Sequence, residues 1–366
     1  MKSHGATRTF GLLTSGGDCP GLDALIRGVA DAATTRYNMN IIGFAGGFRG
    51  LIDGDAHTLK SENFSGMLIP GGSTRIGDST GAAAPRSAAL HDAAVGVAEA
   101  EAAIDSYRRF QLDCIVAIGG YDAMKTAYHL SRHGLNVIAI PKTINNNIWC
   151  TDITYGFHSA VEIACEAIGR LHSTARSHNR IMVTEVMGHT TGWLALYAGL
   201  AADADVILMP ETPYRIEHLQ EHLKQRAERG IHHSIVVVAE GALSEAQSRE
   251  RFSPGRSKYH QSNLGYHIAE QLESETGIET RVTILGHQQR GGAPSAYDRI
   301  LATRFGAGVA DMLHEGAFGR MAALKGNDTA RCRLAEVAGM LRKVPPQHDL
   351  LTAAHAVGTC FGTPPA

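Results

Sequence analysis

The sequence lacks an excess of charge of either sign. It has 34 Lys and Arg against 36 Asp and Glu, a net charge of −2, and a pI near 6.8. No basic field therefore argues for binding to nucleic acid or to an anionic membrane. The 19 His residues are scattered along the chain and form no metal-ligand pattern.

Paired cysteines and long apolar runs are missing too. The six cysteines form no CxxC pair, which argues against a zinc site and against a disulfide framework. No apolar stretch approaches the length of a membrane span. The N-terminal stretch MKSHGATRTF has no apolar run of the kind that a signal peptide needs. These absences predict a cytoplasmic protein.

The chain does have length, glycine and many short apolar runs. Its 366 residues, 44% hydrophobic content and 41 glycines suit a large α/β core with many tight turns. Apolar runs such as 114–118 end in glycine and precede amphipathic segments. One face of the first predicted helix carries five apolar residues: Leu22, Leu25, Ile26, Val29 and Ala30. This alternation predicts mainly parallel sheets covered by helices, with ligands beyond the carboxyl ends of the strands.

The stretch TSGGDCPGLD is a glycine turn between a predicted strand and a predicted helix. It contains Gly16, Gly17 and Asp18. Backbone amides at such a turn, together with the helix dipole, form a natural anion site. An ordinary tight turn also uses glycine for its backbone conformation, so this motif alone favours phosphate only slightly.

Two further strand ends carry polar residues. In IGGYDAMKTA, Asp122 lies near a helix start, where a carboxylate serves either as an Mg²⁺ ligand or as a helix cap. In IAIPKTINNNIWCTD, an apolar run ends at Pro141 and Lys142, and three neutral amides follow where a proton acceptor would be useful.

The stretch TRVTILGHQQRGGAPSAYDRI concentrates charged residues around a glycine pair. The members of this predicted cluster are Arg281, His287, Arg290, Asp298 and Arg299. Arginines and a histidine at a strand end suit bidentate recognition of a phosphate dianion. Surface ion pairs are the alternative. Arg180, just before another apolar run, is by itself typical of a solvated charge.

Taken in order, these stretches resemble the 6-phosphofructokinase family from about Thr9 to Gly306. The family's first phosphate loop reads GGDxPGxN, and this chain has GGDCPGLD. The family's EVMGR…G segment appears as EVMGHTTGW, and its TR…LGHxQRGGxPxxxDR signature appears as TRVTILGHQQRGGAPSAYDR. Several motifs in the same order make the resemblance specific, whereas a single glycine loop would not.

The resemblance implies an α/β fold of two Rossmann-like lobes. Residues 1–156, with a return segment at about 289–340, would form the lobe that binds the phosphoryl donor, ATP or pyrophosphate with Mg²⁺. Residues 157–288 would form the lobe that binds the sugar phosphate, which is fructose 6-phosphate in the family. Residues 341–366 would form a loosely ordered C-terminal tail.

The resemblance also implies roles for individual residues. The sugar-phosphate residues would be Arg180, Met187, Gly188, Glu240, Arg281, His287 and Arg290. The donor-binding residues would be Gly16, Gly17, Asp18, Gly119, Gly120, Tyr121, Asp122 and Lys142, with Asp122 as the one metal ligand. The catalytic positions would be Thr143, Asn145, Asn147 and His189. In tetrameric members the equivalents of Arg180 and Arg281 reach in from a neighbouring subunit, so we expect a homodimer or homotetramer.

The catalytic half departs from the family pattern. Where the family has TIDND this chain has TINNN, so Asn145 takes the position of the catalytic base and Asn147 that of a second aspartate. Tyr121 replaces the aspartate that holds Mg²⁺, and His189 replaces an arginine. Arg75 lies near the position of another expected arginine but is out of register.

Two hypotheses about function follow from these departures. An amide oxygen orients a hydroxyl but is too weakly basic to take its proton, and loss of a general base costs roughly 10²–10⁴-fold in rate. Only Asp18, Asp122 and Asp152 remain as carboxylates at motif positions, while Asp122 and Lys142 match the pyrophosphate-dependent branch. The chain is either a phosphofructokinase-like phosphotransferase with altered residues, or an impaired homologue that binds sugar phosphate as a sensor or subunit partner.

Overall fold

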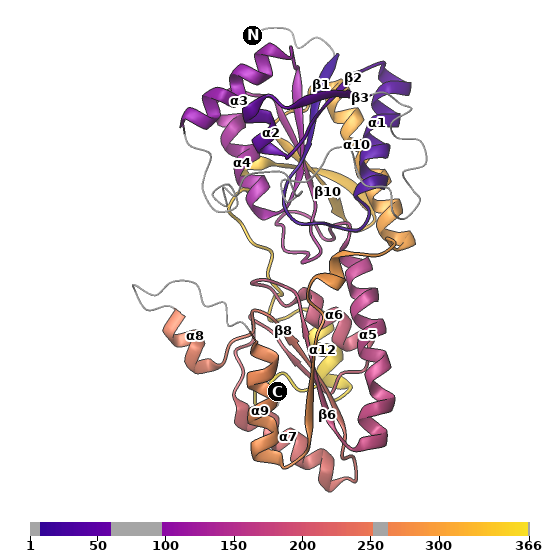
Figure 1. The fold of residues 1–366 in the computed structure, drawn as a ribbon, viewed down its shortest axis with the longest axis vertical. Coiled ribbons are helices and arrows are strands. Elements are labelled where there is room, and N and C mark those ends of the chain that lie inside the picture. The colour runs from indigo at the N-terminus through magenta and orange to yellow at the C-terminus, as the bar shows by residue number, and fades with distance from the viewer. Residues whose placement is uncertain (1–7, 60–96, 252–262, 365–366) are drawn as a thin grey trace. The chain divides into compact units, whose positions relative to one another are not determined.

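The computed structural model describes residues 8–59, 97–251 and 263–364, and Arg75 lies outside these ranges. The chain forms two compact units (Figure 1). The first unit contains the residues up to His158 together with Arg290–Arg342, and the second contains Ser159–Gln289 with Lys343–Ala366. The chain passes from one unit to the other after residues 158, 289 and 342, against the predicted 156, 288 and 340.

The first unit is built on a seven-stranded sheet with the order β11-β10-β5-β4-β1-β2-β3. Its strands are β1 (Thr9–Thr14), β2 (Asn40–Phe44), β3 (Ala56–Leu59), β4 (Cys114–Gly119), β5 (Val137–Pro141), β10 (Arg320–Lys325) and β11 (Asp328–Arg333). The five inner strands are parallel, and the edge strands β3 and β11 pair antiparallel with their neighbours. The predicted mainly parallel sheet is confirmed.

Helices cover both faces of this sheet (Figure 1). They are α1 (Leu22–Tyr37), α2 (Phe48–Asp53), α3 (Val97–Arg109), α4 (Tyr121–Arg132), α10 (Ala296–Glu315) and α11 (Leu334–Val337). Helices α1 and α10 pack on each other, and the apolar face predicted for the first helix is buried. Every residue of β4 and β5 is buried as well, as expected for central strands covered on both faces.

The second unit contains a parallel four-stranded sheet with the order β7-β8-β6-β9. Its strands are β6 (Ile181–Val186), β7 (Val206–Leu208), β8 (Ser234–Ala239) and β9 (Thr280–Ile284). The helices of this part of the chain are α5 (Phe157–His178), α6 (Trp193–Ala201), α7 (Ile216–Glu228), α8 (Glu245–Arg251), α9 (Leu264–Thr276) and α12 (Asp349–Ala356), and a 3₁₀ turn, η3, spans Gly286–Arg290. Apolar side chains of α7 and α9 pack against the sheet and form its core.

The prediction of a loosely ordered C-terminal tail is wrong. The Ile207 amide donates to the Cys360 carbonyl at 2.9 Å, and Val206 forms a parallel bridge with Cys360. Val344 and Phe361 are buried. Pro345 lies in a turn before α12, where its carbonyl accepts from the His348 amide, and the apolar residues of the segment extend the packing of the second unit.

Candidate functional site

Three loops follow neighbouring parallel strands in the first unit, so they meet at one edge of its sheet. Strands β1, β4 and β5 are adjacent. The Ser15 amide donates to the Ile118 carbonyl, and the Lys142 amide donates to the Gly119 carbonyl, each at 2.8 Å. This backbone frame brings together the predicted donor-binding residues around 16–18, 119–122 and 142.

The first loop lies directly against an arginine. A Cβ atom placed on Gly17 would lie only 1.6 Å from Nη1 of Arg290, so the guanidinium packs against this glycine. Gly16 has a φ of 89°, a backbone conformation that favours glycine. The buried Nε of Arg290 has no hydrogen-bond partner among the described residues. A guanidinium with an unused donor beside a glycine loop is suited to an anion.

The second loop carries Tyr121 and Asp122 at the start of α4. The Tyr121 hydroxyl donates to the Gly339 carbonyl at 3.1 Å, and the Lys125 ammonium lies 4.1 Å from the centre of the tyrosine ring. The same ammonium pairs with Asp122 at 3.0 Å. The predicted metal ligand is therefore already engaged with a cation from its own helix.

The donor set of this loop does not fit a metal site built by the protein. Mg²⁺ prefers anionic oxygen ligands, and this loop offers a phenol and a carboxylate paired with lysine. Among the described residues, no group of three or more His, Cys, Asp or Glu side chains is arranged to hold a metal ion.

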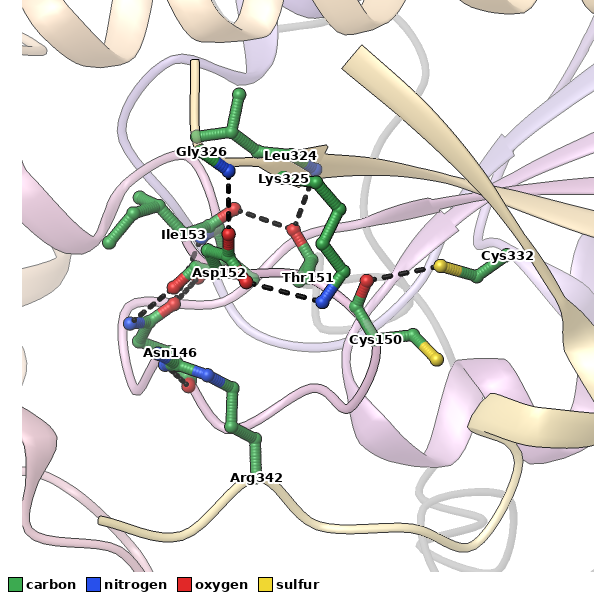
Figure 2. A network of polar contacts seen from close by, with 11 residues as sticks. Asn146, Cys150, Thr151, Asp152, Ile153, Leu324, Lys325, Gly326, Cys332 and Arg342 are labelled. Carbon is green, nitrogen blue, oxygen red and sulfur yellow. Dashed lines mark hydrogen bonds and ion pairs between the residues drawn. The ribbon is translucent and has the colours of Figure 1, made fainter. Parts of the chain in front are cut away.

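The third loop depends on its middle asparagine. Asn146 is fully buried with a φ of 50°. Its Oδ1 accepts from the Thr154 amide at 3.0 Å, and its Nδ2 donates to the Asp152 carbonyl at 3.3 Å (Figure 2). The Arg342 guanidinium donates to the Asn146 carbonyl at 3.2 Å. Asn146 is thus a structural residue that fixes the shape of the loop.

The flanking asparagines have other surroundings. The Asn145 amide donates to the Thr143 hydroxyl at 3.1 Å, which forms a local turn. The Asn147 side chain is buried, and its Oδ1 has no hydrogen-bond partner among the described residues. The backbone carbonyl of Asn147 accepts from the Arg342 amide at 3.0 Å. The side chain of Asn147 therefore contributes less to the loop's backbone than that of Asn146 does.

Asp152, one of the three carboxylates at motif positions, is a structural anchor. It pairs with Lys325 at 3.2 Å and accepts from the Gly326 amide at 2.7 Å (Figure 2). Burial alone would raise the pKa of Asp152, but this amide and Lys325 hold it below its usual value. Asp152 therefore stays ionised and bound to the β10–β11 hairpin.

In the second unit a glutamate holds the loop that follows β6. Glu240, directly after β8, accepts through Oε1 from the amides of Gly188 at 3.2 Å and His189 at 2.7 Å. The Met187 amide lies 3.4 Å from Oε1 of the buried Gln289. A Cβ on Gly188 would lie 2.5 Å from the Thr191 carbonyl, so this position needs glycine. Four predicted residues, Met187, Gly188, His189 and Glu240, are thus brought together.

Arg180 and Arg281 lie at the other end of this sheet. They flank the first residues of β6 and β9, and both pair with Glu279, Arg180 at 2.7 Å. The hydrogen bond from Arg180 is the main reason that the pKa of Glu279 falls below its usual value. His287 follows β9 at the carboxyl end of the strand. One chain therefore divides the predicted sugar-phosphate residues between the two ends of a parallel sheet.

The predicted cluster of charged residues around Gly291 and Gly292 stays a prediction, but three of its members already have contacts of their own. Arg281 pairs with Glu279, and Arg290 packs against Gly17. Asp298 is fully buried in the first turn of α10, where its amide donates to the Ser295 cap. In the structure these three members belong to three elements, β9, η3 and α10.

Sequence reasoning missed several residues that hold these loops. They are Thr154, Glu211, Gln289 and Arg342. Glu211 accepts from the amides of Gly192 and Val344, each at 3.1 Å, and burial raises its pKa. The sequence carried a signal for two of them. Glu211 directly follows the apolar run in ADVILMPE, and Gln289 lies in the motif TRVTILGHQQRGG. Arg342 had none, since it lies more than 190 residues from the loop that it supports.

The fold and the loops define an α/β protein with two units, each presenting polar loops at the carboxyl ends of parallel strands. The phosphofructokinase family model matches residues 9–313. The chain is 54% identical over 360 residues to the ATP-dependent 6-phosphofructokinase of Spirochaeta thermophila, with 98% of each chain covered. The chain therefore belongs to the phosphofructokinase family.

Relatives with different phosphoryl donors are similar to this chain. It is 42% identical to the pyrophosphate–fructose 6-phosphate 1-phosphotransferase of Amycolatopsis methanolica, over 92% of this chain and 96% of the relative. The solved structure of phosphofructokinase from Saccharomyces cerevisiae matches with a TM-score of 0.75 and 28% identity, covering 96% of this chain. This chain spans 46% of the length of that yeast chain. Among the described residues, no helix is long and apolar enough to cross a membrane.

Proposed function

We propose that this protein is a 6-phosphofructokinase-like phosphotransferase with an altered donor half. It would move a phosphoryl group from ATP or pyrophosphate to fructose 6-phosphate or a related sugar phosphate. The observation that carries this proposal is the backbone frame that joins the three loops after β1, β4 and β5, with Arg290 against Gly17. Relatives similar over nearly the whole chain carry these activities in their names.

The residues suggest a division of work in this reaction. The amides of the first two glycine loops and the Arg290 guanidinium would bind and neutralise phosphate, because charge-assisted hydrogen bonds are the stronger kind. Asn145 would orient the acceptor hydroxyl without taking its proton. Positioning and charge neutralisation supply most of the catalysis in phosphoryl transfer, so a frame of this kind retains some activity without a strong base.

The missing carboxylates favour a second candidate function. Position 145 carries an amide and position 121 a phenol, while Asp122 and Asp152 are each paired with a lysine. The protein would then be a catalytically impaired homologue that binds sugar phosphate as a sensor or subunit partner. Mg²⁺, the donor and the cytoplasmic localisation stay predictions in both cases.

A coupled assay with ATP and with pyrophosphate, at high enzyme concentration, separates the two candidates. Brisk turnover by the wild type supports the phosphotransferase, and Asn145→Asp then lowers the rate because it places a charge where a neutral amide is needed. Very slow turnover supports the impaired homologue. In that case Asn145→Asp raises the rate modestly. The double variant with Tyr121→Asp should raise the logarithm of the rate by more than the sum of the increases in the two single variants.

Asn146→Asp is the matched control for this cycle. It makes the same change of amide to carboxylate one residue along the chain. Because Nδ2 of Asn146 donates to the Asp152 carbonyl, this variant loses a buried hydrogen bond and is expected to lose stability without gaining activity. If Asn146→Asp raised the rate as much as Asn145→Asp does, the position of the carboxylate would be irrelevant. That result would contradict both candidate functions.

We also propose a homodimer or homotetramer. Arg180 and Arg281 lie at the end of β6 and β9 opposite to Glu240, so a sugar-phosphate pocket with all predicted residues needs a second copy. Mixing the variants Arg180→Ala and Arg290→Ala should then restore part of the sugar-phosphate binding that each lacks alone. A stable 39 kDa species in light scattering, with full binding, would contradict this assembly.

A further inference from the structure

Two cysteines meet beside the loop of three asparagines. Cys150 follows this loop and Cys332 lies on the edge strand β11, 182 residues later. The Cys332 thiol donates to the Cys150 carbonyl at 3.0 Å (Figure 2). Both residues are half-buried. Burial, and then the neighbouring Cys150 thiol, raise the pKa of Cys332 to about 12. The two thiols are therefore close neighbours with partial access to solvent.

The backbone on both sides of this pair is already joined. The Leu324 amide donates to the Thr151 hydroxyl at 3.0 Å, and the Asp152 amide donates to the Leu324 carbonyl at 2.9 Å. Strand β10 pairs in turn with β11, where Met321 is opposite Cys332. Disulfides form where the backbone already brings two cysteines close together. A bond between these thiols therefore needs rotation of side chains and little movement of the main chain.

Cys150 has an unusual backbone conformation. Its φ is 67°, in the left-handed region that a residue with a Cβ atom adopts at a cost. Such outliers persist where the surrounding structure fixes them, and they concentrate at functional positions. The contacts of Thr151 and Asp152 with β10 hold the cysteine in this conformation.

We propose that Cys150 and Cys332 are an oxidation site that closes to a disulfide on exposure to a peroxide or a small-molecule disulfide. With hydrogen peroxide, the Cys150 thiol is oxidised to a sulfenic acid and one water is released. The Cys332 sulfur then attacks the sulfenic sulfur, forms the S–S bond and releases a second water. Two thiols lose two electrons and two protons, and the peroxide is reduced to two waters.

The disulfide would tie the end of the asparagine loop to the edge of the sheet. Because the two cysteines are 182 residues apart, the cross-link would close a long loop in the unfolded chain. The unfolded chain would then have less conformational freedom, and the folded state would be more stable relative to it. Since the raised pKa keeps the Cys332 thiol protonated at neutral pH, we expect oxidation over hours rather than seconds. The proposal does not rest on phosphotransferase activity, because it concerns thiol chemistry alone.

The test is to incubate the full chain with hydrogen peroxide, or separately with oxidised glutathione, and to map its peptides without reduction. A cross-linked peptide pair containing Cys150 and Cys332 is expected, together with a reversible rise in Tm of roughly 5 °C. Dithiothreitol should remove both. Separate glutathione adducts or sulfinic acids on the two residues, without the cross-link, would overturn the proposal.

Three variants guard this test against misfolding and unspecific oxidation. Cys332→Ser keeps the backbone and should abolish the cross-link and the rise in Tm. Cys165→Ser, on α5, should keep both. Cys150→Gly removes the thiol and relieves the left-handed conformation, so it should raise the Tm of the reduced protein by roughly 2 °C and remove its response to peroxide. A Tm rise that survives in Cys332→Ser would contradict the proposal.

Discussion

The loops of the first unit and those of the second are held in different ways. In the first unit, backbone groups join neighbouring loops: the amides of Ser15 and Lys142 donate to carbonyls at the end of β4. In the second unit, side chains do so, since Glu240 accepts from the amides of Gly188 and His189. A join made by backbone groups persists when side chains change, whereas a join made by a glutamate does not.

This difference matches where the chain departs from the family pattern. Tyr121, Asn145 and Asn147 replace expected aspartates, and all three lie in the first unit. The loop of three asparagines takes its shape from the middle residue, Asn146, which the family pattern retains. His189, a departure in the second unit, is exposed, and its own amide is held by Glu240. The backbone contacts between these loops therefore do not depend on the side chains at 121, 145 and 147.

The largest expected effect comes from filling the space beside Arg290. In Gly17→Ala, the new methyl group occupies the position of the guanidinium, so the arginine must move away from the loop. Because a charge-assisted hydrogen bond contributes about 1.5–3 kcal/mol, affinity for a phosphate ligand should fall roughly 100-fold. Calorimetry with pyrophosphate and with fructose 6-phosphate measures this loss.

Gly16→Ala is the matched control. Its Cβ would have no neighbour nearer than the Gly120 amide at 3.8 Å, but its φ of 89° is unfavourable for alanine. This variant should lose about 1–2 kcal/mol of stability and keep Arg290 in place. Gly17→Ala should show the reverse, with weak binding and near-normal stability. Equal binding by the two variants would contradict a role for Arg290 at this loop.

The second prediction tests the side-chain frame of the second unit. Glu240→Ala leaves the amides of Gly188 and His189 without their acceptor and should lower the free energy of unfolding by about 2 kcal/mol. Glu240→Gln retains an acceptor oxygen and should lose less than half as much. Urea denaturation measures both. If the Ala variant is as stable as the wild type, the comparison between the units fails.

Much of the fold could be predicted because its signals are local. The run 114–118 is an apolar stretch closed by glycine, and it forms a central strand that is buried at every residue. The meeting of the loops after β1, β4 and β5 follows from a general property of parallel sheets. The family itself was predicted from ordered motifs, and the matching family model confirms it.

The errors arose where contacts depend on distant parts of the chain. The motif gave no sign that Arg281 pairs with Glu279 at the amino end of β9. Asp152 was a candidate carboxylate until the β10–β11 hairpin, more than 170 residues away, supplied Lys325 and Gly326. Strand order decides such pairings, and single motifs carry no information on it.

The third prediction contrasts a structural carboxylate with the altered positions. Asp152→Asn should lower the free energy of unfolding at pH 7 by about 1 kcal/mol, a value reduced because the ion pair with Lys325 is partly exposed. The pKa of Asp152 is lowered in the folded state, so its contribution is present above the unfolded pKa and is lost as the pH falls through the folded pKa. The stabilities of the two proteins should therefore converge once the pH lies below the folded pKa of Asp152, which is lower than the ordinary aspartate value of about 3.9.

A separate comparison measures how much more this loop depends on Asp152 than on its neighbour Asn147. Asn147→Ala removes a buried side chain whose Oδ1 has no partner among the described residues, and it introduces no charge. The variant should fold and keep the cross-loop backbone contacts. A loss larger than that of Asp152→Asn would show that the side chains at the altered positions do support the backbone.

The smallest expected effect has the opposite sign and concerns Asp23, in the first turn of α1, where the family pattern has asparagine. Burial raises the pKa of Asp23 well above its ordinary value, to about 6. The folded protein thus binds this proton more tightly than the unfolded chain, so stability is lost as the pH rises from about 4 to about 6. Because the group is half-exposed and the dipole of α1 favours its charge, we expect the loss to be only about 0.5 kcal/mol.

Asp23→Asn should remove this slope, which makes the variant slightly more stable than the wild type at pH 7 and equal to it near pH 3.5. Urea denaturation at pH 7 and at pH 3.5 measures the effect. If the variant is less stable than the wild type at pH 7, the ionised carboxylate of Asp23 has an interaction whose free energy exceeds the cost of its burial.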